Sequence, residues 1–380
     1  MQVTDIQLAR VASEGELSAS VHDLPRRSDP FRLWFRFPPG MLDGIRRQGN
    51  PFLTSLLPVA AKTGSDLKVE GPVSTALYSN FVQIKNIWND WYRLKPGAVS
   101  GQAVESDGEI ASGGVGCFFS GGVDSFYTVL KNLDLEQGEN RISHLIYVRG
   151  FDVDLDDEDL DSLVADRLRR AGDDLGLPVI CVSTNLRRLT NRFTSWGRLQ
   201  HGAAMSGVAH CLSGILGSVL VPATHIYQHV FPWGTHPLLD PLWSDEFVSF
   251  VTDGCEATRA AKVAARISSS EVALQHLRVC HTNEGQAYNC GSCEKCIRTK
   301  VVLKLAGALE RCTSFSEGLD LDQVRSIRIK LRITESFARE TLAVLRERDT
   351  EHDLQDALRK VLSRWNPARI KFHLKDRFLL

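Results

Sequence analysis

The pattern of apolar and polar positions changes once along the chain, near residue 116. Before that point, Phe31–Pro38 alternates apolar and basic residues over part of its length, as a half-buried strand does. Val73–Trp88 carries apolar residues at helical spacing. We therefore expect residues 1–105 to form an N-terminal α+β extension, and the glycine-rich stretch at 106–115 to be a linker.

From residue 116 onward, short apolar runs alternate with segments of helical pattern. The expected helices lie near Asp124–Leu133, Glu158–Leu175 and His201–Leu216. The expected strands are Cys117–Phe119, His144–Val148, Pro178–Val182, Ser218–Pro222 and Ala273–Val279. This alternation predicts an α/β domain at 116–312, with a doubly wound, parallel, five-stranded, Rossmann-like sheet that binds ligands at the carboxyl ends of its strands.

The last part of the chain, residues 313–380, is helical in composition. Within it, Glu335–Arg364 is charged and has leucines at helical spacing. This pattern predicts an amphipathic helix that packs on the α/β domain.

Composition narrows the class of protein. Lys and Arg number 45 and Asp and Glu 46, a formal net charge of −1, which gives little reason to expect nucleic acid or anionic lipid as partners. The most apolar stretch, Cys211–Ala223, is too short to cross ~30 Å of hydrocarbon. The first residues lack the basic and apolar regions of a secretory signal. We expect a cytoplasmic, soluble protein that does not enter a membrane.

The nine cysteines fall into two groups. Five are scattered, and we expect them to be small buried hydrophobes: Cys117, Cys181, Cys211, Cys255 and Cys312. The other four stand close together, with C-x2-C-x2-C spacing at the end: Cys280, Cys290, Cys293 and Cys296. This spacing favours a metal over disulfides, and four thiolates suit a closed, tetrahedral Zn²⁺ site. An iron–sulfur cluster is the alternative. Lys295 and Arg298 would offset the negative charge of the thiolates.

The strongest motif is Ser-Gly-Gly-Val-Asp-Ser at 120–125, between the first expected strand and its helix. Gly121 and Gly122 permit a backbone that brings successive N–H groups toward an anion at the helix start. The hydroxyls of Ser120 and Ser125 can donate to phosphate oxygens, and Asp124 suits a Mg²⁺ ion held between loop and phosphate. The motif lacks the Gly-Lys-Ser/Thr of a Walker A loop. The alternative is a capped helix start after a glycine turn.

A proline-rich loop leaves the fourth expected strand, where ligands of such sheets bind. Its aromatic, histidine and acidic side chains predict a substrate wall made of His225, Tyr227, Trp233, His236 and Asp240. The alternative is a rigid loop whose histidines only satisfy backbone groups. Arg187, Arg188 and Lys262 are basic candidates for binding phosphates.

The motif at 120–125 resembles the PP-loop of the ATP pyrophosphatases, which belong to the adenine nucleotide alpha hydrolase-like (HUP) superfamily. The resemblance implies cleavage of ATP between its α- and β-phosphates, with Asp124 and Ser125 in the catalytic role. Ser120, Gly121, Gly122 and Val123 would complete the grip on pyrophosphate. The end of the second strand would seat adenine, through Tyr147, Val148, Gly150 and Phe151.

Together with the late cysteines, the loop is most similar to the 7-cyano-7-deazaguanine synthase family, which joins the same loop to a C-x8-C-x2-C-x2-C zinc site. Two departures stand out. The first gap is one residue longer here, so His281 could replace Cys280 as a ligand. The loop also follows an extension that the family lacks. These departures indicate a divergent member with another substrate.

We expect an ATP-dependent ligase or amidase-type enzyme. A small-molecule carboxylate would be adenylated with release of pyrophosphate, and ammonia or an amine would then displace AMP. The alternatives are a PP-loop enzyme that transfers sulfur to a nucleobase, and a sensor that binds ATP without turnover. A partner protein that delivers ammonia or sulfur, and a homodimer, are left open.

Overall fold

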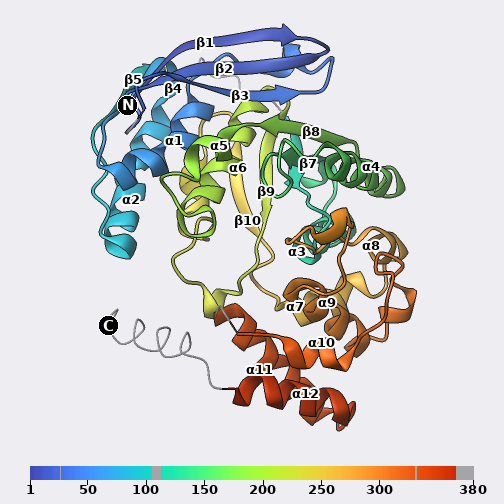
Figure 1. Ribbon diagram of the computed structural model, residues 1–380. Coiled ribbons are helices and arrows are strands. Elements are labelled where there is room, and N and C mark those ends of the chain that lie inside the picture. Colours follow the sequence, from blue (N-terminus) through green and yellow to red (C-terminus); the bar gives the residue numbers. More distant parts are fainter. Residues whose placement is uncertain (26, 105–112, 330–331, 365–380) are drawn as a thin grey trace. The chain divides into compact units, whose positions relative to one another are not determined.

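The computed structural model describes residues 1–25, 27–104, 113–329 and 332–364 (Figure 1). The chain forms two compact units. One comprises Met1–Ser120 and Asp124–Thr258, and the other comprises Gly121–Val123 and Arg259–Leu380, described up to residue 364. The division into four parts that we predict from the sequence stays a prediction.

The first unit is built on one large sheet. Its strands are β1 Gln2–Val11, β2 Glu14–His22, β3 Phe31–Phe37, β4 Leu67–Ser74, β5 Val99–Val104, β6 Gly114–Phe118, β7 Ile142–Arg149, β8 Val179–Thr184, β9 Leu216–Pro222 and β10 Ser249–Asp253. Among the described residues, these ten strands are ordered β10-β9-β6-β7-β8-β3-β2-β1-β4-β5. The five from β10 to β8 are all parallel to their neighbours.

The sheet is α/β and mostly parallel as expected, but the prediction of five strands was wrong, because the N-terminal strands continue the same sheet. β3 pairs antiparallel with β8, where Phe35 faces Thr184. The Asn185 side chain strengthens this junction by accepting from the Trp34 N–H at 3.0 Å and donating to the Arg32 carbonyl at 2.8 Å. A pairing between segments about 150 residues apart leaves no mark on local hydrophobic periodicity.

The predicted fifth strand, Ala273–Val279, was also wrong. Glu271–His276 is a helix, α8, whose first turn is capped by the Ser270 hydroxyl accepting from the Ala273 N–H at 3.2 Å. A short apolar run fits either a strand or a buried helix, and the capping serine was the signal that distinguishes them. The fifth parallel strand is β10, and it pairs with β9.

The expected helices around the parallel strands are present. They are α3 Val123–Leu135, α4 Glu158–Leu175 and α6 His201–Cys211, with the short α5 Leu186–Thr190. The last of the three predicted helices stops at Cys211, before the residues that lead into β9. In the extension, α1 Asn50–Thr63 is buried along most of its length and packs on α6 and β4, and α2 Thr75–Tyr92 follows β4.

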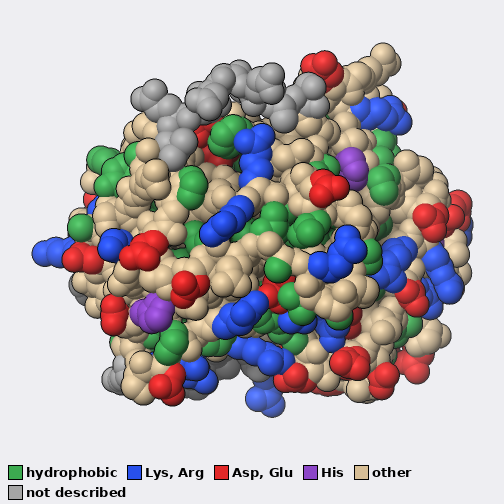
Figure 2. All heavy atoms as spheres, turned by 90° about the horizontal axis from the view of Figure 1, so that it is seen from above, with side chains coloured by type: hydrophobic (Ala, Val, Ile, Leu, Met, Phe, Trp, Pro, Cys, Tyr) green, Lys and Arg blue, Asp and Glu red, His purple; other side chains and the backbone are tan. Residues whose placement is uncertain are grey.

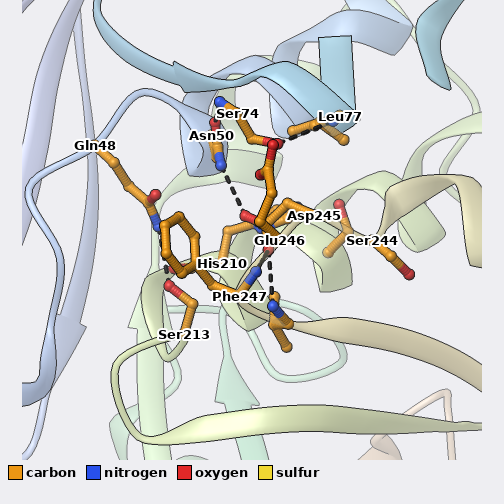
Figure 3. A network of polar contacts seen from close by, with 12 residues as sticks. Gln48, Asn50, Ser74, Leu77, His210, Ser213, Ser244, Asp245, Glu246 and Phe247 are labelled. Carbon is orange, nitrogen blue, oxygen red and sulfur yellow. Dashed lines mark hydrogen bonds and ion pairs between the residues drawn. The ribbon is translucent and has the colours of Figure 1, made fainter. Parts of the chain in front are cut away.

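A buried polar network ties the extension to the parallel strands (Figure 3). His210 and Asp245 are both fully buried, with His210 Nδ1 3.0 Å from Asp245 Oδ2. The same carboxylate oxygen accepts from the Asn50 side chain at 2.8 Å, and the other accepts from the Phe247 N–H at 2.8 Å. The pKa of Asp245 is lowered, since these partners, led by His210, outweigh the cost of burial. Asn50 also accepts from the Ser74 N–H, so the network links α1, β4 and the segment before β10.

The second unit is helical. It contains α7 Arg259–Lys262, α8, α9 Glu294–Leu305, α10 Leu321–Ser326, α11 Arg332–Glu347 and α12 His352–Ser363. The C-terminal region is thus helical as expected, but Glu335–Arg364 spans two helices rather than one. Leu345 of α11 and Leu354 and Leu358 of α12 are buried, as their helical spacing predicts.

The surface fits the near-balanced composition. On the face seen in Figure 2, Lys and Arg side chains are interspersed with Asp and Glu. In the part of the chain that the structure describes, none of the helices combines the length and the apolar character that crossing a membrane requires.

Candidate functional site

The motif at 120–125 lies where the sequence predicts it, in the turn from β6 to α3. Gly121 has φ +73°, a left-handed conformation that favours glycine. Ser120 is exposed, Asp124 is half-buried and Ser125 is buried at the start of the helix. β6 lies between β7 and β9, and the chain winds to opposite sides from it. Loops that leave β6 and β9 therefore begin at the topological switch point, where open α/β sheets bind ligands.

One face of α3 is anchored to the carboxyl ends of β9 and β10. Asp124, Thr128 and Lys131 follow one another at helical spacing. The Thr224 hydroxyl donates to Asp124 Oδ2 at 3.5 Å. Thr128 and Lys131 both donate to the Asp253 carboxylate, at 2.7 and 2.8 Å. Burial disfavours charged Lys131, but its bonds to acidic partners outweigh this effect and raise its pKa.

The loop after β9 lines a small hollow of about 10 Å³ at the same edge of the sheet. Its walls include Thr224, His225, Phe231, Thr235, His236 and Cys255. Thr224 also contacts Asp124, the acidic residue of the motif at 120–125, which we call the glycine loop. Asp124 therefore lies beside the wall of the hollow. Two segments singled out separately in the sequence thus meet at one residue.

A row of partly exposed rings runs from the hollow to the end of β7. The consecutive ring centroids of Phe151, Trp196, His201, Trp233 and His225 lie 4.9, 6.3, 6.0 and 6.1 Å apart. Phe231 packs on the rings of both His225 and Trp233. The Arg187 guanidinium lies 4.6 Å from the centroid of the Trp196 ring, and it donates to the Phe151 carbonyl. Such a row offers stacking surface to a planar ligand.

His201, which sequence reasoning missed as a site residue, is held in one tautomer. Its Nδ1 lies 3.1 Å from the Trp196 carbonyl, which can only accept, so Nδ1 carries the proton. Its Nε2 accepts from the Thr235 hydroxyl at 2.9 Å. Burial lowers the pKa of His201 to about 4, and the ring is neutral at pH 7. The carbonyl belongs to a π-helical turn at Trp196–Gln200, a feature frequent at functional sites.

The residues predicted to seat adenine divide into two kinds. Phe151 belongs to the row of rings. Tyr147 and Val148 are buried, and the Tyr147 hydroxyl donates to Asp161. Gly150 has φ +91°, and a Cβ there would stand 2.2 Å from the Thr184 carbonyl oxygen. The adenine assignment stays a prediction, which Phe151 supports best.

The predicted substrate wall divides in the same way. Asp240 is fully buried and accepts from the His236 N–H at 3.0 Å and the Thr252 hydroxyl at 2.7 Å. Burial raises its pKa to about 7. The His236 ring packs on Trp91 at 4.8 Å. Asp240 braces the loop, whereas His225, His236 and Trp233 belong to the hollow or the ring row. Tyr227 is 59% exposed.

The other basic candidates are placed differently from Arg187. Arg188 forms an ion pair with Asp156 at 2.6 Å on the surface. Lys262 belongs to the second unit and is almost fully buried in α7.

The four cysteines of the second unit form one cluster. Their sulfur atoms, from Cys280, Cys290, Cys293 and Cys296, all lie within 4.8 Å of one another. A tetrahedral Zn²⁺ with bonds of about 2.3 Å separates its sulfurs by about 3.8 Å, so the group needs only a small contraction to fit the ion. Gly291, at φ +72°, makes the tight turn that lets the Cys293 N–H donate to Cys290 Sγ at 3.3 Å.

The cluster contains Cys280 rather than the neighbouring His281. Cys280 is buried, whereas His281 is exposed and its Nδ1 lies 3.8 Å from Cys293 Sγ. The extra residue of the first gap is accommodated in an excursion at 281–288, with a left-handed Asn283 and Gly285 at its tip. The histidine is placed to donate to the Cys293 sulfur, and the group of side chains that could hold a metal includes Cys280 rather than His281.

Charge compensation comes from the helix start and from buried lysine. Cys293 caps the N-terminus of α9, whose dipole favours a thiolate. Hydrogen bonding with Cys296 lowers the pKa of Cys293 to about 2 and raises the pKa of Cys296. Lys300 is fully buried, and its Nζ donates to the Gly318 carbonyl at 2.9 Å. Burial lowers the pKa of Lys300, and the nearby cysteines act in the opposite direction. The apolar residues that follow Lys300 in the sequence gave no reason to expect it at the cluster.

Comparison of the chain with protein-family models, with curated proteins and with solved structures gives no match. The resemblance to PP-loop enzymes therefore rests on the residues of the loop and of the cysteine cluster.

Proposed function

We propose that this protein is an ATP-dependent enzyme that adenylates a small carboxylate and then passes the activated acyl group to ammonia or an amine. The observation that carries the proposal is the contact of Asp124 with Thr224, which joins the glycine loop to the hollow. A carboxylate oxygen is a poor leaving group, and AMP is a good one, so activation and substrate binding must occur side by side.

The chain's own groups suit this chemistry. Gly121 in its left-handed conformation and the start of α3 offer N–H groups to the pyrophosphate that departs. Asp124 offers a hard, anionic oxygen, the kind of ligand that Mg²⁺ takes, and bound Mg²⁺ would neutralise charge on the departing phosphates. Neutral His201 and the rings beside it would orient a substrate without adding a charge.

The test is to measure the products of ATP in the presence of a panel of small carboxylates and ammonium. AMP and pyrophosphate formed in equal amounts, and only with an acceptor acid, support the proposal. ADP and phosphate as products would refute it. Binding of ATP without turnover under every condition would favour the sensor.

Sulfur transfer is the second candidate, because Cys255 is one of the residues that line the hollow. That reaction needs a thiol that takes part in each turnover, whereas adenylation followed by amine attack does not. Cys255→Ser distinguishes the two. Unchanged pyrophosphate release supports the ligase, and complete loss of acceptor modification with retained adenylation supports sulfur transfer.

A further inference from the structure

Asn289 clamps the segment that leads into the cysteine cluster. It is buried, and it immediately precedes the ligand Cys290. Its Oδ1 accepts from the N–H groups of Val279 and Cys280, at 2.9 and 3.2 Å. Its Nδ2 donates to the Leu277 carbonyl at 2.8 Å and to the Ser314 carbonyl at 3.1 Å. One side chain thus fixes the backbone on both sides of Arg278.

Arg278 connects this clamped segment to the glycine loop. Its backbone N–H donates to the Gly121 carbonyl at 2.7 Å. Gly121–Val123 belong to the same compact unit as the cysteine cluster. The Arg278 side chain also donates to Asn283 at 2.9 Å, in the excursion between the first two cysteines.

The hydrogen bond from Arg278 to the Gly121 carbonyl also sets the direction of the Gly122 N–H. The C=O of Gly121 and the N–H of Gly122 belong to the same planar, trans peptide group, so they point in opposite directions. Holding the carbonyl toward Arg278 therefore aims the Gly122 N–H the other way. That N–H is one of the groups expected to bind an anion at the start of α3.

We propose that the cysteine cluster, with its metal bound, positions the glycine loop, and that Asn289 is the positioning residue that connects them. The metal would hold Cys280 and Cys290 together, Asn289 would set residues 277–280, and Arg278 would then orient the Gly121–Gly122 peptide. The consequence for pyrophosphate rests on the proposed function, whereas the mechanical connection does not.

The first experiment compares two buried asparagines in the full-length protein. Asn289→Asp keeps the oxygen that accepts from Val279 and Cys280. It replaces the Nδ2 group, which donates to the carbonyls of Leu277 and Ser314, by a carboxylate oxygen that cannot donate. We expect zinc to stay bound, hydrogen exchange of peptides that contain Gly121–Val123 to rise about tenfold, and inorganic pyrophosphate to bind about tenfold more weakly.

Asn132→Asp is the matched control. Asn132 is also buried, accepts from the Ile142 N–H at 2.8 Å, and donates to the Asn140 carbonyl at 3.1 Å, in the other unit. We expect it to lower thermal stability while exchange at Gly121–Val123 and pyrophosphate affinity stay at wild-type values.

The second experiment removes the metal from the wild-type protein with a chelator, and it decides the question if Asn289→Asp fails to fold. Faster exchange at Gly121–Val123, with α12 still protected and reversal on adding zinc, supports the proposal. Unchanged loop exchange, or a rise only together with α12, overturns it. An enzyme that never releases pyrophosphate would refute the proposed function and leave this exchange result standing.

Discussion

The glycine loop and the cysteine cluster differ in the sequence separation of the residues that form them. The four sulfurs come from residues 280–296 alone. Asp124, by contrast, contacts Thr224, and its neighbour Thr128 is anchored by Asp253, each partner 100 residues or more away. The cluster is a local structure that a metal can complete. The loop region depends on a folded sheet that brings distant segments together. Substitutions in the loop should therefore lower catalytic activity without unfolding the protein. Substitutions in the cluster should lower the free energy of unfolding without changing a group that reacts.

The largest effect is expected at the loop. Asp124→Asn should lower AMP formation on the order of 10³-fold, about 4 kcal/mol, because the amide is a poor Mg²⁺ ligand of almost the same volume. The melting temperature should stay unchanged, and Asp134→Asn, at the exposed end of the same helix, should keep full activity. Ser120→Ala removes one donor among several and should lose only about tenfold. Steady-state product assays check these values, and full activity in Asp124→Asn would remove that residue from the mechanism.

Substitutions in the cysteine cluster should lower stability rather than remove a reacting group. Cys293→Ser is expected to reduce the zinc content from about one per chain to near zero, and to lower the free energy of unfolding by roughly 3 kcal/mol or more. Metal analysis and urea unfolding measure the two effects. Cys312→Ser, at a buried cysteine outside the cluster, should keep the metal. A brown protein with near-stoichiometric iron after anaerobic purification would show an iron–sulfur cluster in place of zinc.

A third substitution tests whether Asp240, in the loop after β9, has a structural role rather than a catalytic one. Asp240 has a pKa raised to about 7 from 3.8, so the folded state binds a proton that the unfolded state has lost. Its contribution therefore opposes folding increasingly as the pH rises from about 4 to 7. Asp240→Asn should stabilise the protein by about 2 kcal/mol at pH 8 and by nearly nothing at pH 4. Urea unfolding at both pH values tests this, and equal stabilisation at both would mean that Asp240 is ionised in the fold.

The same contrast explains what the sequence could predict. The spacing of the late cysteines predicts a metal site, and the Gly-Gly turn between strand and helix predicts an anion site, because both signals are local. The four cysteines do form one cluster, and the anion site stays a prediction. The Asn185 bridge to β3 depends on a partner about 150 residues away, and the hydrogen bond between Thr235 and His201 joins residues 34 apart. Periodicity carries no information about such partners. The misassigned strand at 273–279 is the exception, since its apolar run was compatible with two structures and the signal that distinguishes them, the capping Ser270, is local.

The smallest effect is expected at the edge of the cluster. His281 is exposed and lies 3.8 Å from Cys293 Sγ, so it can donate to a sulfur that the metal already holds. His281→Ala should keep one zinc per chain and change the free energy of unfolding by less than about 0.5 kcal/mol, because an exposed donor is readily replaced by water. Cys280→Ser, one residue away, should lose the metal under the same conditions. Metal content after dialysis against a weak chelator gives the comparison. If His281→Ala lost zinc and Cys280→Ser kept it, the longer first gap would have moved the ligand position to the histidine. The proposed connection through Asn289 would then have to start from His281 instead of Cys280.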